Sequence, residues 1–151
     1  MTKVQTITSI DAAPAKVWEI LVDFPRWSEW NPFIVDLQGA PRAGEPVRLR
    51  IKPPGLPGSA SITAKMLLVV PGRELRWKGQ VLSSRVMSGE HSFVLEPAGP
   101  GRTRFIHTEV FTGVLSPVFG LVGKSPTRRG FEAMDRALKA RAEAAAAEAT
   151  S

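Results

Sequence analysis

The amino-acid sequence predicts an α+β domain in which a curved antiparallel sheet of about seven strands wraps around a long C-terminal helix. Three observations predict this architecture. Alternating segments separated by proline and glycine turns fill the middle of the chain, two short helical segments follow the first strand, and a helical period replaces the strand period near residue 116. Because a sheet needs a cover for its apolar face, the last helix is its expected cover.

The length and composition fit a single intracellular domain. A chain of 151 residues with 43% hydrophobic residues and no cysteine can bury a core without disulfides. We expect one domain over residues 1–151, with a frayed tail over about 144–151. No apolar run approaches the roughly 18 residues of a membrane span, and the N-terminus lacks a secretory pattern. We therefore expect no membrane insertion and a cytoplasmic location.

The first third of the chain predicts a strand followed by two short helices. Residues 3–10 alternate in polarity and end at Asp11, which predicts the opening strand. Pro14 fits a first helical position, and the helical spacing over residues 15–24 predicts a helix that Pro25 ends. A second short helix over residues 26–31 places Trp27 and Trp30 on one face.

Alternating segments predict the next strands. Residues 33–37 lead into a turn at 41–44, and strands are expected over 47–51, 62–68 and 75–81. The proline- and glycine-rich residues 53–59 form a loop that we expect to rim a cavity. Pairing Val70 with Arg73 across the turn at Pro71 places Met66 opposite Trp77.

The segment from residue 89 to 111 predicts a hairpin connected by breaker residues 97–101. Pairing Glu96 with Arg102 places His91 opposite His107 and Phe93 opposite Phe105, with Glu109 opposite Gly89. Since side chains alternate between faces, one face carries the ionisable trio together with aromatic and aliphatic side chains. That face comprises His91, Phe93, Leu95, Phe105, His107, Glu109 and Phe111. An apolar interior with a few convergent polar groups is typical of a small-molecule pocket.

The C-terminal part predicts an interrupted helix. Ser116 and Ser125 each precede a proline, a pattern typical of a helix N-cap, so a break or kink is expected near Ser125. The long half, from Pro126 to about residue 147, has an apolar stripe. The stripe contains Phe131, Met134 and Leu138, while Arg128, Arg129, Asp135, Arg136 and Lys139 are placed off it.

Four segments carry a resemblance to a known family: residues 13–24 (Ala-Pro-Ala-Lys-Val-Trp to Asp-Phe), 27–33 (Trp-Ser-Glu-Trp-Asn-Pro-Phe), 89–93 (Gly-Glu-His-Ser-Phe) and 131–139. Together they resemble the START-like, or SRPBCC, helix-grip superfamily in its polyketide cyclase/dehydrase and lipid-transport branch. The resemblance covers nearly the whole chain and implies a deep apolar cavity between the sheet and the long helix. The superfamily includes lipid carriers, polyketide cyclases, hydroxylase subunits, chaperone activators and ribosome-associated proteins, so the fold implies no single reaction.

Inward-facing side chains are the candidates for lining this cavity. Their alternative interpretation is ordinary core, but aromatic side chains and methionine also suit an apolar ligand. Gly79 and Gly89 lie where a missing side chain eases bending or admits a ligand. The candidate cavity residues are Trp30, Phe33, Met66, Trp77, Gly79, His91, Phe93, Phe105, His107, Glu109, Phe111, Phe131, Met134 and Leu138.

His91, His107 and Glu109 are the candidate catalytic residues, as an acid and base set in which a carboxylate orients an imidazole. The structural alternative, favoured here, is a cluster whose members satisfy one another's hydrogen bonds. The trio also matches the ligand count of a non-haem iron site, but a cross-strand pair seldom places three ligands on one side of a metal. We expect no metal and no cofactor.

Cations collect on the opposite face of the strands. This face is either a surface for RNA or an acidic protein, or a solvated face that Glu74, Glu90 and Glu96 partly neutralise. The second interpretation is favoured because no exposed aromatic stripe accompanies the charge, so nucleic acid is not an expected partner. The cations are Arg48, Arg50, Lys52, Lys65, Arg76, Lys78, Arg102 and Arg104, in a chain of formal charge +6.

Three functional hypotheses follow. The leading one is the binding of a small hydrophobic molecule, such as a lipid, a fatty acid or a polyketide-like aromatic, whose polar end meets His91, His107 and Glu109. The second is a polyketide cyclase or dehydratase that uses the same trio. The third is an interaction protein that uses the basic sheet face. A homodimer stays open under each.

Overall fold

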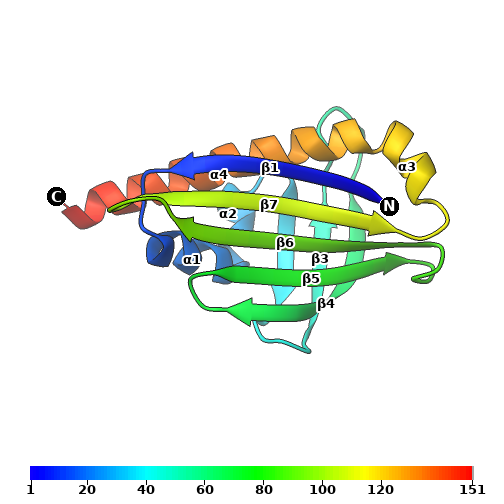
Figure 1. The fold of residues 1–151 in the computed structure, drawn as a ribbon, viewed down its shortest axis with the longest axis horizontal. Helices are drawn as coiled ribbons and strands as arrows, with labels where there is room; N and C mark the ends of the chain where they lie inside the picture. The colour runs from blue at the N-terminus through cyan, green and yellow to red at the C-terminus, as the bar shows by residue number, and fades with distance from the viewer. Residues whose placement is uncertain (151) are drawn as a thin grey trace.

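A seven-stranded antiparallel sheet curls around one side of helix α4, as seen in the computed structural model of residues 1–150 (Figure 1). Its spatial order is β1-β7-β6-β5-β4-β3-β2. The strands are β1 (Thr2–Ile10), β2 (Ile34–Gly39), β3 (Pro46–Ile51), β4 (Ala60–Val70), β5 (Glu74–Val81), β6 (Met87–Pro97) and β7 (Thr103–Thr112). The predicted α+β architecture is confirmed.

Short helices carry the chain from β1 at one edge of the sheet to β2 at the other. They are α1 (Pro14–Val22), the 3-10 helix η1 (Phe24–Arg26) and α2 (Trp27–Trp30). Pro14 lies in the first turn of α1, where a missing N–H costs no hydrogen bond. The buried Trp27 indole donates a hydrogen bond to the carbonyl of Leu21 at 3.1 Å, which fixes α2 against the end of α1.

The C-terminal helix is interrupted at Gly123, two residues before Ser125, so the predicted break near Ser125 is confirmed. Helix α3 (Ser116–Val122) ends there, and α4 (Lys124–Thr150) begins with the next residue. Pro126 therefore lies in the first turn of α4, where helices accept proline. The fraying over residues 144–151 stays a prediction, since α4 is helical to Thr150 and Ser151 lies outside the described residues.

The register between β4 and β5 contains a bulge. Met66 lies opposite Trp77, as predicted, but Val70 pairs with Glu74 and not with Arg73. The two pairings differ because the register shifts between Met66 and Leu68. The buried side chains of Met66 and Trp77 still face inward.

The predicted register between β6 and β7 is wrong by two residues. His91 lies opposite Glu109, and Phe93 lies opposite His107. The strand extends to Pro97, and Ala98 and Arg102 close the turn with a backbone hydrogen bond of 3.0 Å. A shift of two residues keeps every side chain on its predicted face, because the side-chain period of a strand is two.

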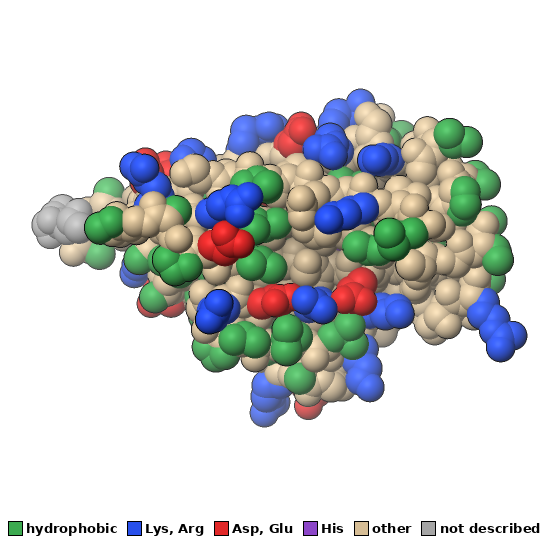
Figure 2. Space-filling model, in the orientation of Figure 1, with side chains coloured by type: hydrophobic (Ala, Val, Ile, Leu, Met, Phe, Trp, Pro, Cys, Tyr) green, Lys and Arg blue, Asp and Glu red, His purple; other side chains and the backbone are tan. Residues whose placement is uncertain are grey.

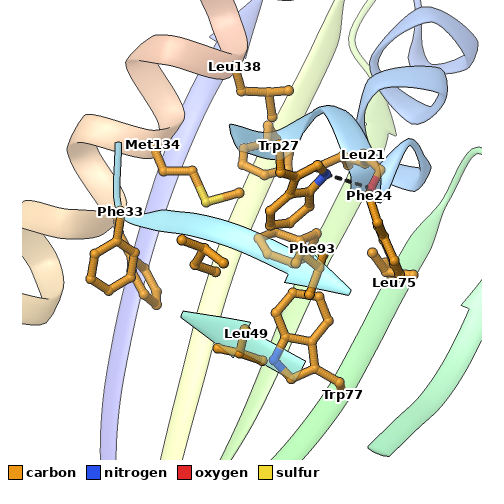
Figure 3. Packing of buried hydrophobic residues seen from close by; sticks show 14 of the residues in the cluster. Leu21, Phe24, Trp27, Phe33, Leu49, Leu75, Trp77, Phe93, Met134 and Leu138 are labelled. Atoms are coloured by element: carbon orange, nitrogen blue, oxygen red, sulfur yellow. Dashed lines mark hydrogen bonds between the residues drawn. The ribbon is translucent and has the colours of Figure 1, made fainter. Parts of the chain in front are cut away.

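Aromatic and aliphatic side chains fill the half of the interior beside α1 and α2 (Figure 3). The Trp27 ring lies 6.1 Å from Trp77 and 6.0 Å from Phe93, measured between ring centroids. Met134 and Leu138 reach the same cluster from α4, and both are fully buried. The apolar stripe of α4 is therefore confirmed as the surface that covers the sheet.

The outer face of the sheet carries the predicted cations. Arg76 pairs with Glu74 and with Glu90, and Arg104 Nη1 lies 3.0 Å from Glu96 Oε2. These pairs support the interpretation of a solvated, partly neutralised face. Within residues 1–150, the structure contains no helix long and apolar enough to cross a membrane.

Candidate functional site

A cavity of about 420 Å³ lies between the sheet and the junction of α3 with α4, next to the aromatic core, to which its lining residues Phe33 and Trp77 belong. The residues that line it are mostly apolar and come from five strands, α3, α4 and their junction, the loop after β3 and the segment before β2. They are Phe33, Leu49, Ile51, Pro53, Leu56, Ile62, Ala64, Trp77, Gly79, Gln80, Val81, Met87, Ser88, Gly89, His91, Glu109, Phe111, Phe119, Val122, Gly123, Pro126 and Thr127.

The cavity follows from two interruptions in regular structure. Pro53 and Leu56 line it from the loop over residues 53–59, as predicted for a loop that rims a cavity. The helix break at Gly123 turns α3 away from the axis of α4, so Phe119 and Pro126 form the wall on the helical side. Further along α4, Met134 and Leu138 are fully buried in the core cluster.

His91 and Glu109 form the polar part of the cavity wall. They face each other across β6 and β7, and His91 Nδ1 lies 3.4 Å from Glu109 Oε2. Gly89 gives the carboxylate its space, since a Cβ at that position would lie 2.6 Å from Glu109 Oε1. The Glu109 side chain is 17% exposed, so it is the more accessible of the two.

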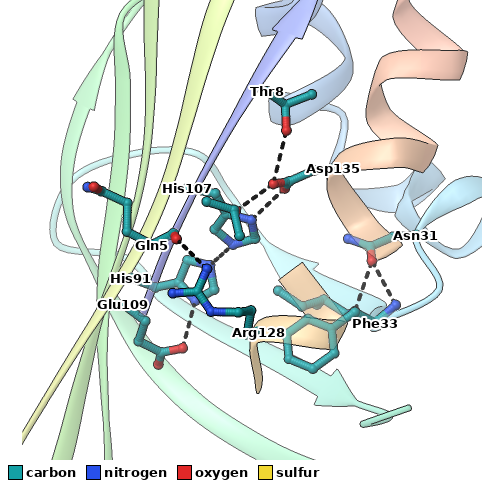
Figure 4. A network of polar contacts seen from close by, with 11 residues as sticks. Gln5, Thr8, Asn31, Phe33, His91, His107, Glu109, Arg128 and Asp135 are labelled. Atoms are coloured by element: carbon teal, nitrogen blue, oxygen red, sulfur yellow. Dashed lines mark hydrogen bonds and ion pairs between the residues drawn. The ribbon is translucent and has the colours of Figure 1, made fainter. Parts of the chain in front are cut away.

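His107 lies behind this wall in the packed interior. Its Nε2 is 2.6 Å from His91 Nε2, and its Nδ1 is 2.7 Å from Asp135 Oδ1 on α4 (Figure 4). The Phe131 ring stacks on the imidazole at 3.7 Å, with an angle of 5° between the planes. His107 therefore contacts the cavity only through His91.

Asp135 completes a continuous polar chain from Glu109 to β1. The Thr6 hydroxyl donates to Asp135 Oδ2 at 2.5 Å, and the Thr8 hydroxyl donates to the same oxygen at 3.3 Å. Both oxygens of this buried carboxyl group thus accept hydrogen bonds.

These contacts determine which ring nitrogen of each imidazole carries a hydrogen. Burial lowers the pKa of His107 to about 4, against the opposing effect of Asp135, so its ring is neutral near pH 7. His107 Nδ1 carries its single hydrogen because it faces the Asp135 carboxylate, which leaves Nε2 as an acceptor. His91 Nε2 must then donate to His107 Nε2, and the other ring nitrogen of His91, Nδ1, faces Glu109 Oε2.

The prediction that Asp135 lies off the buried stripe is wrong, since Asp135 is 2% exposed. The sequence contained a signal for its position, because Asp135 stands four residues after Phe131 and three before Leu138. Both spacings place it on the same helical face as those residues. A search for apolar residues at helical spacing omits this position, because aspartate is polar.

The structure divides the candidate cavity residues into two groups. Phe33, Trp77, Gly79, His91, Glu109 and Phe111 line the cavity. Met66, Phe93, Phe105, His107, Phe131, Met134 and Leu138 lie buried in the interior outside the lining, and Trp30 is partly buried against the core. Sequence reasoning missed much of the aliphatic lining, including Leu49, Ile62, Val81 and Met87. Strand alternation places Leu49, Ile62 and Val81 on the inward face, but aliphatic side chains at inward positions do not by themselves distinguish a cavity wall from a packed core.

Among residues 1–150, no group of three or more His, Asp or Glu side chains is arranged to hold a metal ion. The inward polar groups form the hydrogen-bonded chain described above.

Comparisons with known proteins identify the family. A family model described as polyketide cyclase/dehydrase and lipid transport matches residues 1–147. A search of curated proteins gives no match. Similar solved structures include a START superfamily protein from Mycobacterium smegmatis, with 21% identity, a TM-score of 0.76, and coverage of 95% of this chain and 98% of that one.

Two aromatase/cyclases are also similar in structure. The Zhui aromatase/cyclase from Streptomyces sp. R1128 has 17% identity and a TM-score of 0.72, with 93% of each chain covered. The di-domain aromatase/cyclase StfQ of the steffimycin pathway has 16% identity and a TM-score of 0.69, with 99% of this chain and 51% of StfQ covered. At such identities the structural likeness shows a shared fold. Together with the family match over residues 1–147, it shows that the chain belongs to the polyketide cyclase/dehydrase and lipid transport family.

Proposed function

We propose that this protein binds a small hydrophobic molecule, such as a lipid, a fatty acid or a polyketide-like aromatic, in the cavity beside His91. The observation that carries the proposal is the cavity itself, about 420 Å³ with a mostly apolar lining. This volume lies within the range of about 300–1,000 Å³ that is usual for small-molecule sites. Membership of a family that includes lipid-transport proteins supports the same function.

The cavity favours a ligand with one polar end. Glu109 and His91 lie together on one wall, and the neighbouring Ser88 hydroxyl is 2.8 Å from the Thr112 hydroxyl. A ligand hydroxyl placed here can donate to the Glu109 carboxylate, while the apolar walls surround the remainder. A neutral aromatic with a hydroxyl group meets these conditions better than a purely aliphatic molecule, because it leaves no wall group without a partner.

A substitution that fills the cavity tests the proposal. Ala64 lines the cavity on β4, and Thr63 is its exposed neighbour on the opposite face. A neutral naphthalene dye, with emission that depends on polarity, should bind the protein saturably with one site per chain. The substitution Ala64→Leu should weaken binding at least tenfold, because the larger side chain occupies ligand space. The matched control Thr63→Leu should bind like the parent protein.

Two results would contradict the proposal. One is the absence of saturable binding of this dye and of any co-purifying small molecule in native mass spectrometry. The other is equal dye binding by Ala64→Leu and the parent protein. Circular dichroism and urea unfolding of each variant show whether the fold is intact.

The polar chain favours a second candidate function, a cyclase or dehydratase. Glu109 and His91 contact the cavity, and His107 with Asp135 lies behind them in hydrogen-bonding distance. Such a chain can take a proton from a carbon beside a carbonyl and return one to a leaving hydroxyl, which is the chemistry of aldol cyclisation followed by dehydration. The candidate catalytic residues are then His91 and Glu109, and His107 is a positioning residue that acts through His91.

Turnover of a poly-β-keto substrate tests this second function. Glu109→Gln and His91→Gln should each abolish turnover, while binding of the naphthalene dye persists. Unchanged turnover in both variants would exclude the enzymatic role and leave the binding role intact.

A further inference from the structure

Exposed aliphatic side chains gather at the end of the molecule where the cavity lies. On α3 the outward residues Val118, Leu121 and Val122 are 57%, 87% and 72% exposed. Leu82, in the turn after β5, is 89% exposed, and Val114, just before α3, is 75% exposed. Isolated exposed aliphatic residues are ordinary on protein surfaces, but a contiguous group of this kind marks an interaction site.

Hydrogen bonds make this group contiguous. The N–H of Val114 donates to the carbonyl of Arg85 at 3.0 Å, and the N–H of Leu115 donates to the carbonyl of Val86 at 3.0 Å. The turn after β5 is thereby held beside the segment that leads into α3. Figure 2 shows hydrophobic side chains at the end of the molecule where α3 lies.

The exposed aliphatic side chains at this end of the molecule lie next to the cavity. Leu56, Val81 and Val122 are exposed and also line the cavity, so each belongs to both surfaces. We call the exposed aliphatic set the mouth rim; it consists of Leu56, Val81, Leu82, Val114, Leu115, Val118, Leu121 and Val122. A ligand that enters the cavity passes between these side chains.

The charged side chains in the segments that carry the mouth rim are all positive. The segments 52–59, 80–89 and 113–131, which carry the rim, contain no Asp or Glu. Their exposed cations include Lys52, Arg85 and Lys124. Within the described part of the chain, none of these three has a carboxylate within ion-pair distance. Their charge is therefore available to an anionic partner.

We propose that the mouth rim docks on the surface of an anionic lipid membrane. The aliphatic side chains of α3 enter the head-group region, and Lys52, Arg85 and Lys124 pair with lipid phosphates around them. The seven residues of α3 are too few to span a bilayer, so the contact is peripheral. Docking in this orientation opens the cavity toward the bilayer, and a hydrophobic ligand moves between membrane and cavity without crossing water.

The choice of a lipid surface over an acidic protein rests on the proposed function, since a membrane is both the partner and the source of an apolar ligand. The aliphatic rim inside a set of cations also matches the layered chemistry of an anionic bilayer, apolar below and negatively charged at the surface.

Vesicle flotation tests the docking. The protein should float with vesicles of about 30% phosphatidylglycerol in phosphatidylcholine, bind less to pure phosphatidylcholine, and lose affinity as salt increases. The double substitution Val118→Ser and Leu121→Ser should weaken vesicle binding at least tenfold, because two apolar side chains no longer enter the interface. Lys124→Gln should weaken it about fivefold.

Matched controls lie on β4, away from the rim. Leu67 is an exposed aliphatic residue and Lys65 an exposed cation on that strand. Leu67→Ser and Lys65→Gln should leave vesicle binding unchanged. Equal vesicle binding by the parent protein and the α3 double variant would overturn the proposal, as would failure of the parent protein to bind anionic vesicles. Salt-sensitive binding to an acidic protein in place of vesicles would also overturn it.

Dye binding separates this proposal from the proposed function. Val118 and Leu121 do not line the cavity, so the α3 double variant should bind the naphthalene dye like the parent protein. Loss of vesicle binding with intact dye binding supports the docking surface. Vesicle binding by a protein that never binds an apolar probe would contradict the proposed function and leave the docking surface standing.

Discussion

Lowering the pH from 7 to 4 should destabilise the protein through His107. Burial lowers the pKa of this imidazole from 6.5 to about 4, although its hydrogen bond to Asp135 acts in the opposite direction. In the unfolded chain the imidazole takes up a proton near 6.5. Between these two values the unfolded state binds more protons than the folded state, so the free energy of unfolding falls as the pH falls.

The magnitude follows from the difference between the two pKa values. A fall from 6.5 to about 4 corresponds to about 3 kcal/mol, because each pKa unit is worth about 1.4 kcal/mol. This contribution is fully present above pH 6.5, is lost progressively as the pH approaches 4, and changes no further below that value. It is a large share of the roughly 5–15 kcal/mol that stabilises an ordinary domain.

Urea unfolding, followed by tryptophan fluorescence at several pH values, measures the effect. Acid also weakens the ion pairs of Glu29 with Arg141 and of Glu143 with Lys139, whose hydrogen bonds lower the pKa values of both carboxyl groups. The loss of stability in acid is therefore compared between the parent protein and His107→Gln. Both proteins contain the two ion pairs, so the difference between their losses excludes the contribution of these pairs. The parent protein should lose about 3 kcal/mol more than the variant between pH 7 and 4. Equal losses, or an imidazole that titrates at 6.5 or above by NMR, would refute the reasoning.

Two further predictions concern α4 and are measured by the same unfolding experiment. Asp135→Ala should lower the free energy of unfolding by about 3 kcal/mol, because it leaves the buried His107 Nδ1 hydrogen without an acceptor. The control Glu132→Ala, at an exposed position nearby on α4, should change it by less than about 0.5 kcal/mol. Gly130→Ala should cost about 1–3 kcal/mol although alanine favours helices, because the new Cβ would overlap the Phe33 ring. Equal stability of Asp135→Ala and Glu132→Ala, or a more stable Gly130→Ala, would contradict these expectations.

Strand alternation predicted the faces of the sheet better than its register. His91, Phe93 and His107 face inward as expected, even though the pairing across β6 and β7 differs from the prediction by two residues. The register depends on where the turn between β6 and β7 closes. Pro97 stays within β6, and β5 does not reach it, because the first residue of β5, Glu74, lies opposite Val94. A proline at this position interrupts no hydrogen bond to β5, so the strand continues past the predicted turn.

The division between cavity and core could not be read from the sequence. Trp77 and Phe105 share the inward parity, yet Trp77 lines the cavity and Phe105 lies in the packed interior. The difference depends on how closely each part of the C-terminal region approaches the sheet. Gly130 lets α4 approach the Phe33 ring, and the residues on either side of the break at Gly123, Phe119 and Pro126, line the cavity.

The hydrogen-bonded chain could be predicted in part. Strand alternation brought His91, His107 and Glu109 to one face, but it could not give their order, which depends on the register. The fourth member, Asp135, comes from α4 and is brought into contact only by tertiary packing. For this reason the sequence predicted a compact trio, and the structure contains a linear chain with only two members on the cavity wall.

A crystal structure of the protein soaked with a brominated naphthol tests the binding function most directly. The expected result is an anomalous bromine peak within the space bounded by Ile62, Val81 and Phe119, with the naphthol hydroxyl within hydrogen-bonding distance of Glu109. An empty cavity after soaking at saturating concentration, or side chains that fill this space in the crystal, would contradict the binding of an apolar molecule at this site.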